Sequence, residues 1–470
     1  MQRSQTPKLL RRALVVTAAV GLAGASAASA QTVTGGAAGT SPLAGVQDDR
    51  AIQVAPDGRF RTMAEAGARI ARIDLRWDYV AKTRPADGTN PDDPAYDWST
   101  YDAAVTAARK YKVQVLFTVW GTPEWAVDTS TFADGDRSYG DYTFPPAQMA
   151  DFESFATAAA TRYGKLGVRH WEGWNEPNVP MFLQPQFRKV GAKSVPASPT
   201  IYSDLEKAFY RGIKKADPKA LVAGVVTSPA GSGPKEKNPI RVTPQNFVKA
   251  LNAKALRPPM DFVAHHPYPV RKRTDRPTPP NRSYADLYNL DDFTRTVDKT
   301  YLKGKRLWLT EYGFATARTP EYPTIVSAAE QANSISDAYA RMKRTPRVMV
   351  AVYYLLQDHK GWKSGLLTMT GAKKAGYAAH ALPLWPQKPT STRVLVGQVR
   401  PAVGRTKVTV QTLSRGKWRA ARTIGTSADG SFRVTVANRT RVPTRVTWKG
   451  KTRAGTNAVL VSRVVNAGGR

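Results

Sequence analysis

The chain has 470 residues, no cysteine and a formal net charge of +34. The absence of cysteine excludes disulfides, thiolate metal sites and a cysteine nucleophile, so the fold must rest on a large hydrophobic core. The length exceeds that of one ordinary domain, and the positive charge favours polyanionic partners.

The first 30 residues have the three parts of a secretory signal peptide. An apolar run over 13–25 is followed by a small-residue cleavage site at Ala28-Ser29-Ala30. The positive region before the apolar run contains Arg3, Lys8, Arg11 and Arg12. A membrane anchor is the alternative, but the run is shorter than the ~20 residues that a spanning helix needs. We therefore expect a secreted protein with no transmembrane segment, in which residues 31–43 lead into the first domain.

Apolar runs of strand length alternate with helical patterns between residues 44 and 382. Strict alternation of strands and helices predicts a closed parallel (β/α)8 barrel, a TIM barrel, over 44–382. A doubly wound open sheet is the alternative, which is weakened because no glycine-rich phosphate loop follows the first strand. The predicted strands are residues 45–47, 72–75, 113–119, 170–174, 221–226, 262–264, 306–309 and 348–355. The predicted helices include residues 151–163, 202–216, 244–253, 291–301 and 328–344.

The C-terminal region has a different period. Residues 383–390 contain three prolines, which predict a linker. Beyond it, apolar residues alternate with polar ones, as at Phe432, Val434 and Val436. This period predicts a small all-β sandwich (Ig-like) over 391–470.

Positive charge is concentrated in the same region. From Lys388 to Arg470 the chain has 18 cations and one acid, Asp429, which gives a net charge of +17. Because export argues against nucleic acid, an anionic cell-wall polymer or an acidic glycan is the partner that the charge favours. The alternative is that arginine is simply the preferred surface residue of this genome. The sequence does not indicate an oligomeric state.

Two glutamates lie at the ends of predicted strands. Glu176 lies in Trp174-Asn175-Glu176-Pro177, and Glu311 lies in Thr310-Glu311-Tyr312-Gly313. The Pro and Gly breakers indicate that each strand enters a loop there. The fourth and seventh strands of a closed barrel end at the same mouth, where carboxylates are typically catalytic. Two such carboxylates suit glycoside hydrolysis, with one acting as acid and the other as base or nucleophile.

Over roughly residues 44–380, these two segments resemble those of the retaining glycoside hydrolase clan A, which includes cellulase-like and xylosidase-like barrel families. The resemblance implies that Glu176 is the acid/base and Glu311 the nucleophile. It also implies roles in substrate binding or in support of the nucleophile for other residues. These residues are Arg72 with Trp77 on the second strand, Trp120 and Trp125 after the third, Asn175 on the fourth, and His266 and Tyr268 on the sixth.

The implied roles have physical requirements. Glu176 must be protonated at rest, so its pKa should be raised by burial and by the negative charge of Glu311. Glu311 must stay ionised, which Arg72 and the Tyr268 hydroxyl would favour. Asn175 could hydrogen-bond a sugar 2-hydroxyl. We interpret His266 as a hydrogen-bonding wall of the site rather than as a base.

Tryptophans supply flat faces on which sugar rings can stack. Trp77, Trp125 and Trp362 are the candidates, although a buried tryptophan is an equally good interpretation of each. The tryptophan common at the end of the eighth strand in the clan has no obvious equivalent, because Tyr353, Tyr354 and Gln357 stand there. The five histidines lack HExxH-like spacing, so we expect no metal and no cofactor.

These features predict a secreted retaining glycoside hydrolase that cleaves O-glycosidic bonds, of β configuration, in a poly- or oligosaccharide. The alternative is a non-catalytic carbohydrate-binding or cell-wall-binding protein on the same scaffold. A third interpretation has the basic sandwich as an anchor, with the barrel remodelling the wall or capsule of its own cell. The sugar, and endo versus exo action, stay open.

Overall fold

The computed structural model describes residues 41–232, 239–269, 283–318, 325–388, 390–436 and 441–468. The predicted signal peptide over 1–30, and residues 31–40 of the lead-in, lie outside the described residues. No helix within the described ranges combines the length and the apolar character that crossing a bilayer requires.

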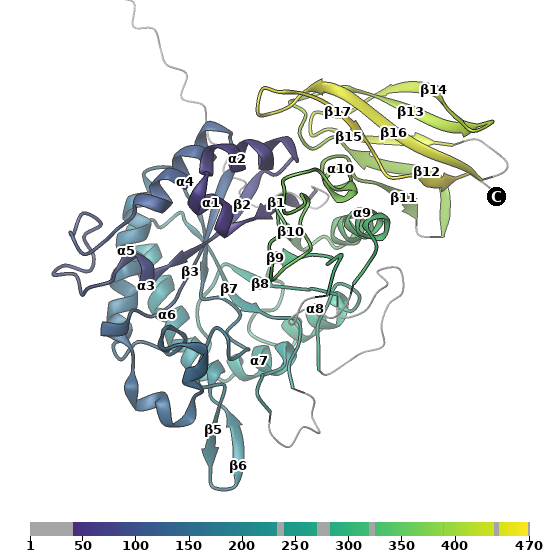
Figure 1. The fold of residues 1–470 in the computed structure, drawn as a ribbon. Helices are drawn as coiled ribbons and strands as arrows, with labels where there is room; N and C mark the ends of the chain where they lie inside the picture. The colour runs from purple at the N-terminus through teal and green to yellow at the C-terminus, as the bar shows by residue number, and fades with distance from the viewer. Residues whose placement is uncertain are drawn as a thin grey trace, which may run out of the picture. The chain divides into compact units, whose positions relative to one another are not determined.

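Eight parallel strands close into a barrel in the order β1-β10-β9-β8-β7-β4-β3-β2 (Figure 1). The ring is complete because β1 pairs with both β10 and β2. The strands are β1 (Leu43–Gln47), β2 (Ile70–Arg76), β3 (Gln114–Trp120), β4 (His170–Gly173), β7 (Leu221–Thr227), β8 (Phe262–His265), β9 (Leu307–Tyr312) and β10 (Val348–Tyr354). The predicted barrel is confirmed, and the closed ring excludes the open sheet.

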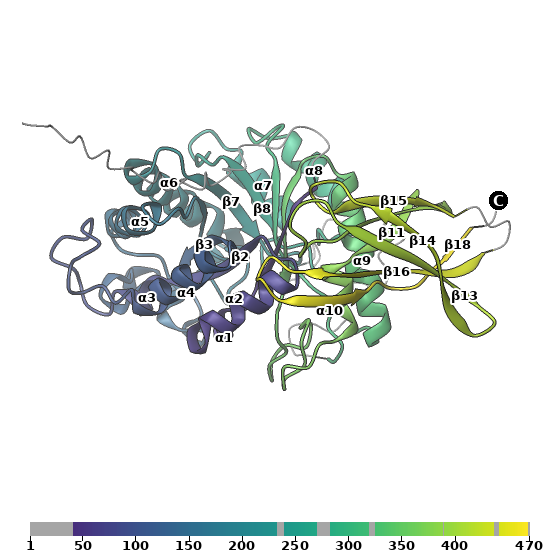
Figure 2. The ribbon, with the colours of Figure 1, turned by 90° about the horizontal axis from the view of Figure 1, so that it is seen from above.

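Helices lie outside the ring of strands, as α4, α5 and α6 do in Figure 2. Helix α9 begins with a capping box, in which the Ser327 hydroxyl accepts from the Glu330 amide and the Glu330 carboxylate accepts from the Ser327 amide. This arrangement satisfies two amides that have no partner inside a helix. The helices are α1 (Asp49–Val54), α2 (Pro56–Glu65), α3 (Trp77–Val80), α4 (Ser99–Lys110), α5 (Met149–Gly164), α6 (Ser198–Ala216), α7 (Pro244–Leu251), α8 (Leu290–Asp298), α9 (Ala328–Arg344) and α10 (Ala375–Ala381). A hairpin of β5 (Phe187–Val190) and β6 (Lys193–Pro196) interrupts the alternation.

An apolar floor fills the barrel interior below the polar site. Trp308 is its largest member and stacks on Phe262 with ring centroids 4.7 Å apart. Burying a large apolar side chain of this kind contributes roughly 1.5–3 kcal/mol. The buried members of the floor are Ile70, Leu116, Ala223, Val226, Ala264, Trp308, Val350 and Val352. The floor leaves the C-terminal strand ends as the place in the barrel where polar side chains converge.

The C-terminal region forms antiparallel sheets, as its period predicted (Figures 1 and 2). One sheet has the order β11-β12-β15, and the other has the order β14-β13-β16-β17 with β18 paired to β16. Apolar residues at alternate positions are buried, including Val408, Val410, Phe432, Val434 and Val446. The strands are β11 (Leu384–Lys388), β12 (Ser391–Gln398), β13 (Lys407–Ser414), β14 (Lys417–Gly425), β15 (Ser431–Thr435), β16 (Val442–Lys451), β17 (Asn457–Val461) and β18 (Val465–Ala467).

The predicted linker over 383–390 is wrong for Leu384–Lys388, because these residues form β11 and pair with β12. Leu384 is fully buried, and Trp385 is 4 % exposed and packs edge-on against Tyr339 of α9. Pro386 is tolerated because β11 is an edge strand, where a missing amide hydrogen removes no ladder hydrogen bond on the outer side. The burial of Leu384 and Trp385 therefore outweighs the tendency of the prolines to interrupt regular structure.

The C-terminal sheets pack on barrel helices within one compact unit. Arg463 donates to the Leu384 carbonyl and, at 2.6 Å, to the Asp337 carboxylate of α9. Thr456 donates to Glu65 of α2 at 3.0 Å. Removing the sheets would therefore uncover buried barrel surface, so a deletion is a poor test of what the basic region binds.

Candidate active site

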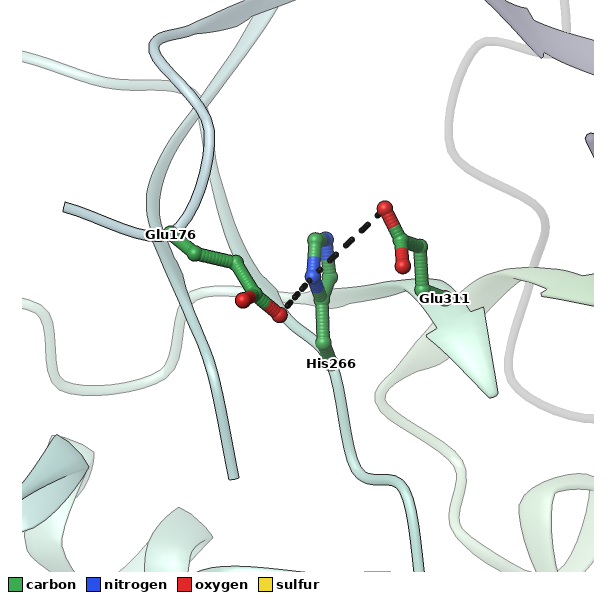
Figure 3. Close-up of side chains that lie close together, drawn as sticks. All are labelled: Glu176, His266 and Glu311. Carbon is green, nitrogen blue, oxygen red and sulfur yellow. Dashed lines mark hydrogen bonds and ion pairs between the residues drawn. The ribbon is translucent and has the colours of Figure 1, made fainter. Parts of the chain in front are cut away.

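The two predicted glutamates meet at the barrel mouth. Glu311 is in β9, and Glu176 lies in the loop just after β4. One carboxylate oxygen of each, together with a ring nitrogen of His266, lie within 4.8 Å of one another. Figure 3 shows the His266 ring between the two carboxylates. The imidazole Nδ1 is 2.8 Å from Glu176 Oε1 and 3.8 Å from Glu311 Oε1.

Arg72 of β2 joins the polar groups of the site. Its guanidinium is fully buried and donates to Glu311 Oε1 at 2.6 Å, to Glu172 Oε2 at 2.8 Å and to Asn175 Oδ1 at 2.7 Å. A buried guanidinium is tolerated only when carboxylates compensate its charge and fill its donors. Arg72 therefore fixes Glu311 and Asn175 in place, and Glu172 is a buried polar residue that compensates its charge.

Tyr268 holds the other oxygen of Glu311. The phenol donates to Oε2 at 2.6 Å, and burial raises the pKa of Tyr268 well above its usual range, so the phenol stays protonated. Burial raises the pKa of Glu311, and the charge of Glu176 adds to this, whereas Arg72 and the Tyr268 hydrogen bond oppose it. The two donors are charge-assisted and favour the ionised carboxylate.

Glu176 lies in an environment that favours the neutral acid. Burial raises its pKa to about 7, and Arg72 and Arg241 oppose the rise. The two carboxylates repel each other, and this repulsion contributes to the rise in the pKa of Glu311. Burial also lowers the pKa of His266 to about 4. The imidazole is therefore neutral near pH 7 and contacts Glu176 as a hydrogen-bond partner, in accord with its predicted place in the wall.

The loop that carries Glu176 has an unusual backbone. Trp174 and Glu176 have φ angles of 67° and 36°, in the left-handed region that is costly for residues other than glycine. Asn178 secures the loop: its amide donates to the Val242 carbonyl at 3.0 Å, and its Oδ1 accepts from the Ser228 amide at 2.7 Å. Strain held in this way is typical of functional sites.

The raised pKa of Glu176 predicts a pH-dependent stability change. A carboxyl whose folded-state pKa lies above its unfolded value binds its proton more tightly when folded, so stability falls as the pH rises from about 4.5 to about 7. We expect Glu176→Gln to raise the melting temperature at pH 8 by about 2–5 °C and to change it little at pH 4. Calorimetry at both pH values measures this, with the exposed Glu124→Gln as the matched control. An equal change at both pH values would contradict the assignment.

The predicted platform at Trp77 is wrong. Trp77 is fully buried and stacks on Phe155 at 5.7 Å beneath α5. Trp125 is half-buried, and the Arg84 guanidinium covers its ring at 4.4 Å. Trp120 is 5 % exposed, with Arg76 against its ring at 4.1 Å. Trp77 therefore has no open face, and a guanidinium lies over one face of each of the other two rings.

Trp362 lies beside the nucleophile candidate instead. It is half-buried and packs edge-on against Tyr268 at 5.6 Å and Tyr354 at 5.4 Å. Tyr353 points away from the mouth, since its hydroxyl donates to the Ser364 carbonyl at 2.7 Å. Gln357 donates to the Met369 carbonyl at 2.8 Å. At the end of the eighth strand and in the segment that follows it, Tyr354 and Trp362 therefore flank the site.

Sequence reasoning missed several polar residues near Arg72. Gln47 accepts from Arg72 at 2.9 Å and donates to Asp49 at 2.7 Å. Asp74 is 3.3 Å from Arg72, and its amide donates to Asp49. Burial, together with the charge of Asp74, raises the pKa of Asp49 to about 8. Side-chain alternation along the strand could have identified Asp74. It is two positions after Arg72 in one strand, so both side chains face the same side of the sheet.

A second buried acid lies behind the strand that leads to Glu176. Glu206 of α6 is fully buried and accepts from Tyr202 at 2.9 Å. A Cβ on Gly173 would lie 2.2 Å from Glu206 Oε2, so the glycine makes room for the carboxyl group. Burial raises the pKa of Glu206 well above its usual range. The helical pattern predicted α6 but gave no sign of this inward acid.

The Glu176, His266 and Glu311 donor atoms could in principle hold a metal ion. Arg72 argues against this interpretation, because its guanidinium is 2.6 Å from Glu311 and would repel a second cation at that oxygen. The same three groups suit proton transfer and nucleophilic attack, since they combine one carboxyl that favours its proton with one that is held by two donors.

Comparisons with known proteins agree with this geometry. A family model described as cellulase (glycosyl hydrolase family 5) matches residues 54–345, more than half of the chain. No curated protein matches the chain.

Solved structures share the fold. A monomeric β-xylosidase from Caulobacter crescentus CB15 is 15 % identical with a TM-score of 0.54, over 85 % of this chain and 95 % of that one. A glucosidase from Croceicoccus marinus is 14 % identical with a TM-score of 0.54, over 91 % and 98 %. A family 39 glycoside hydrolase from Bacteroides cellulosilyticus WH2 is 17 % identical with a TM-score of 0.52, over 84 % and 81 %.

The match of the family model spans the strands that carry both glutamates, and those glutamates meet at the mouth of the barrel. The chain therefore belongs to the cellulase family, glycosyl hydrolase family 5, and is a glycosidase.

Proposed function

We propose that this glycosidase retains anomeric configuration and cleaves β-linked glycosides by double displacement, with Glu311 as nucleophile and Glu176 as acid/base. One observation carries the proposal: the nearest carboxylate oxygens lie within 4.8 Å of each other. Retaining enzymes hold their carboxyl groups ~5–5.5 Å apart, whereas inverting enzymes need ~6.5–9.5 Å to admit a water.

In the first step, a Glu311 oxygen attacks the anomeric carbon while the bond from that carbon to the leaving oxygen breaks. Glu176 gives its proton to the leaving oxygen and becomes a carboxylate. In the second step, Glu176 takes a proton from water as the water oxygen attacks the anomeric carbon. The bond to Glu311 breaks, and both groups return to their starting charge states.

The neighbours of Glu311 support both steps. Arg72 and Tyr268 stabilise the carboxylate at rest and again when it departs in the second step. Asn175 uses its Oδ1 to accept from Arg72, which leaves the amide nitrogen to donate to a sugar 2-hydroxyl. Trp362 offers a half-buried ring that packs against Tyr268, the donor to Glu311, and we assign sugar stacking to it.

The stereochemistry of the first product tests the mechanism. We expect proton NMR of an aryl β-glycoside reaction to show the β-anomer of the free sugar before mutarotation produces the α-anomer. A panel of β-glycosides first identifies a sugar that is cleaved. Early appearance of the α-anomer would mean inversion and would refute the double displacement.

Export is part of the proposed function. The charged, apolar and small-residue parts of residues 1–30 support it. Sequencing the N-terminus of protein recovered from the medium should give a start just after Ala30, and retention of Met1 in the cell fraction would refute export. The non-catalytic alternative has no structural observation in its favour, because both carboxylates keep their supporting donors.

We further propose that the basic C-terminal sheets hold the enzyme on an anionic polymer of the cell wall. We expect combined substitution of four exposed cations by glutamine to weaken retention on isolated walls while turnover of a small glycoside stays the same. The four are Lys407, Lys417, Arg419 and Lys449. At physiological salt an exposed charge attracts a polyanion only within ~8–10 Å. Retention should therefore depend on the cations that lie on the surface in contact with the wall.

Salt-gradient elution from walls measures the retention. The matched control replaces four exposed lysines of the barrel: Lys112, Lys165, Lys219 and Lys303. If the barrel variant loses as much retention as the sheet variant, the charge acts through the whole surface and the C-terminal anchor is wrong.

A further inference from the structure

A cavity of about 580 Å³ lies where the C-terminal sheets meet the N-terminal ends of β1 and β2. The barrel contributes Leu43 and Arg69, helix α9 contributes Lys343, and the C-terminal sheets contribute Arg400 and Asp429. The catalytic glutamates lie at the opposite ends of the strands, so this cavity is separate from the active site.

Arg400 is buried in the wall of this cavity and does not use all of its hydrogen-bond donors. It is 4 % exposed, and its Nη1 donates to the His380 carbonyl at 2.8 Å. Within the described part of the chain, Nε and Nη2 are buried and have no hydrogen-bond acceptor. Leaving a buried donor without an acceptor is destabilising, and more so when the donor is charged. A guanidinium does not lose its proton, so the two donors stay charged. An acceptor from outside the described residues would satisfy them.

The position of Arg400 is fixed from two sides. The Tyr339 ring lies 3.8 Å from the guanidinium carbon. Gly67 approaches so closely that a Cβ there would be 2.4 Å from the Arg400 Cβ. Gly67 has a φ of 84°, which glycine adopts at little cost. The free donors are therefore held in place before any ligand arrives.

Two further cations line the cavity without a direct ion pair to a carboxylate among the described residues. Arg69 and Lys343 are half-buried, and burial lowers the pKa of each. The charge of Asp429 opposes this fall for Lys343, and the charge of Arg400 adds to it, as expected for cations that repel one another. Among residues 41–468 that the structure describes, no ion pair within 4.0 Å joins Arg69, Lys343 or Arg400 to a carboxylate. The three charges are thus uncompensated by direct contact.

Asp429 is the one carboxylate on the cavity wall, and its oxygens are already engaged. Oδ1 accepts from the Ser427 hydroxyl at 2.5 Å and the Ser431 amide at 3.0 Å. Oδ2 accepts from the Ser431 hydroxyl at 2.8 Å. Asp429 therefore stabilises its own turn, and the cavity keeps three cations against one acid.

We propose that this cavity binds a tetrahedral oxyanion, a phosphate or sulfate group, through Arg400, Arg69 and Lys343. The fork of a guanidinium matches the oxygens of such a group, and a double negative charge balances the surplus of two positive charges. The group is either a free ion or an ester on a polymer. Because its ligands come from both the barrel and the C-terminal sheets, the bound anion strengthens their junction. The site does not depend on glycoside cleavage.

Isothermal titration of the full-length protein with sodium phosphate, at ionic strength held constant with sodium chloride, tests the site. We expect saturable binding of one phosphate per chain and a rise in melting temperature that saturates with it. Arg69→Gln and Lys343→Gln should each weaken binding at least tenfold. Arg433→Gln, which removes an exposed cation of β15 away from the cavity, should leave binding unchanged. Melting curves without phosphate show that each variant is folded.

Competition separates the two sources of the anion. If poly(glycerol phosphate) displaces phosphate from the wild type and loses affinity in the Arg69 and Lys343 variants, the site takes a polymer ester. If the polymer does not displace phosphate, the site takes the free ion. Absence of saturable phosphate binding, or an equal loss in all three variants, overturns the proposal.

Discussion

Glu311→Ala lowers kcat/KM on every substrate by roughly 10⁴–10⁶-fold, the scale seen when a covalent nucleophile is removed. The physical reason is that the variant lacks the carboxylate that would form the bond to the anomeric carbon. Arg72 and Tyr268 both direct their donors at Glu311. The loss of kcat/KM should be as large on an activated aryl glycoside, because a good leaving group does not supply a nucleophile. Initial-rate kinetics on aryl and alkyl glycosides measure the loss.

The control for this variant is Glu172→Gln. Glu172 is fully buried and also accepts from Arg72 at 2.8 Å, so its replacement disturbs the same guanidinium without removing the nucleophile. We expect a loss of about 10²-fold or less, because Arg72 keeps its bond to Glu311. Azide added to Glu311→Ala gives a glycosyl azide of inverted configuration or none. A retained product, or equal losses in the two variants, would mean that Glu311 is not the nucleophile.

The barrel and its two glutamates could be predicted because the relevant signals are local. Val348 to Tyr354 and the other barrel strands are apolar runs of strand length that end near Gly, Pro or polar residues. A closed barrel then brings strand ends to one mouth whatever their separation in the chain. The placement of Glu176 and Glu311 at one mouth follows from that rule, whereas the supporting role of Arg72 was implied by the resemblance to the clan A glycoside hydrolases.

Other features depend on packing between distant segments, which residue type does not encode. Trp77 and Trp362 have the same chemistry, but α5 covers Trp77 with Phe152 and Phe155. Pro386 marks a linker only if the chain around it is exposed, and α9 instead buries Trp385. The cavity around Arg400 forms only where the C-terminal sheets pack against the barrel, so no local sequence motif predicts it.

Glu176→Ala has an effect that depends on the leaving group. An alkyl or sugar leaving oxygen needs a proton in the transition state, and general acid catalysis is worth roughly 10²–10⁴-fold. A nitrophenolate leaves without one. We expect a first-step loss near that full range on natural-type glycosides and about tenfold or less on activated aryl glycosides. Stopped-flow release of the phenol measures the first step apart from the second.

Azide separates the role of Glu176 from a general loss of structure. In Glu176→Ala the glycosyl-enzyme on Glu311 still forms, but no base activates water to cleave it. Azide needs no base and should restore turnover to give a glycosyl azide of retained configuration. His266→Asn serves as the matched control, since it removes the 2.8 Å partner of Glu176 and keeps the acid. That variant should show no rescue by azide.

The pH profile completes the assignment. The acid must be protonated, and burial raises the pKa of Glu176 to about 7, so kcat/KM of the wild type falls as the pH rises through about 7. The nucleophile must be ionised, so kcat/KM also falls at low pH, below the raised pKa of Glu311. In Glu176→Ala the fall at high pH should vanish on activated aryl glycosides while the fall at low pH remains. Loss of the low-pH limb instead would exchange the roles of the two glutamates, because it would show that Glu176 is the group that must be ionised.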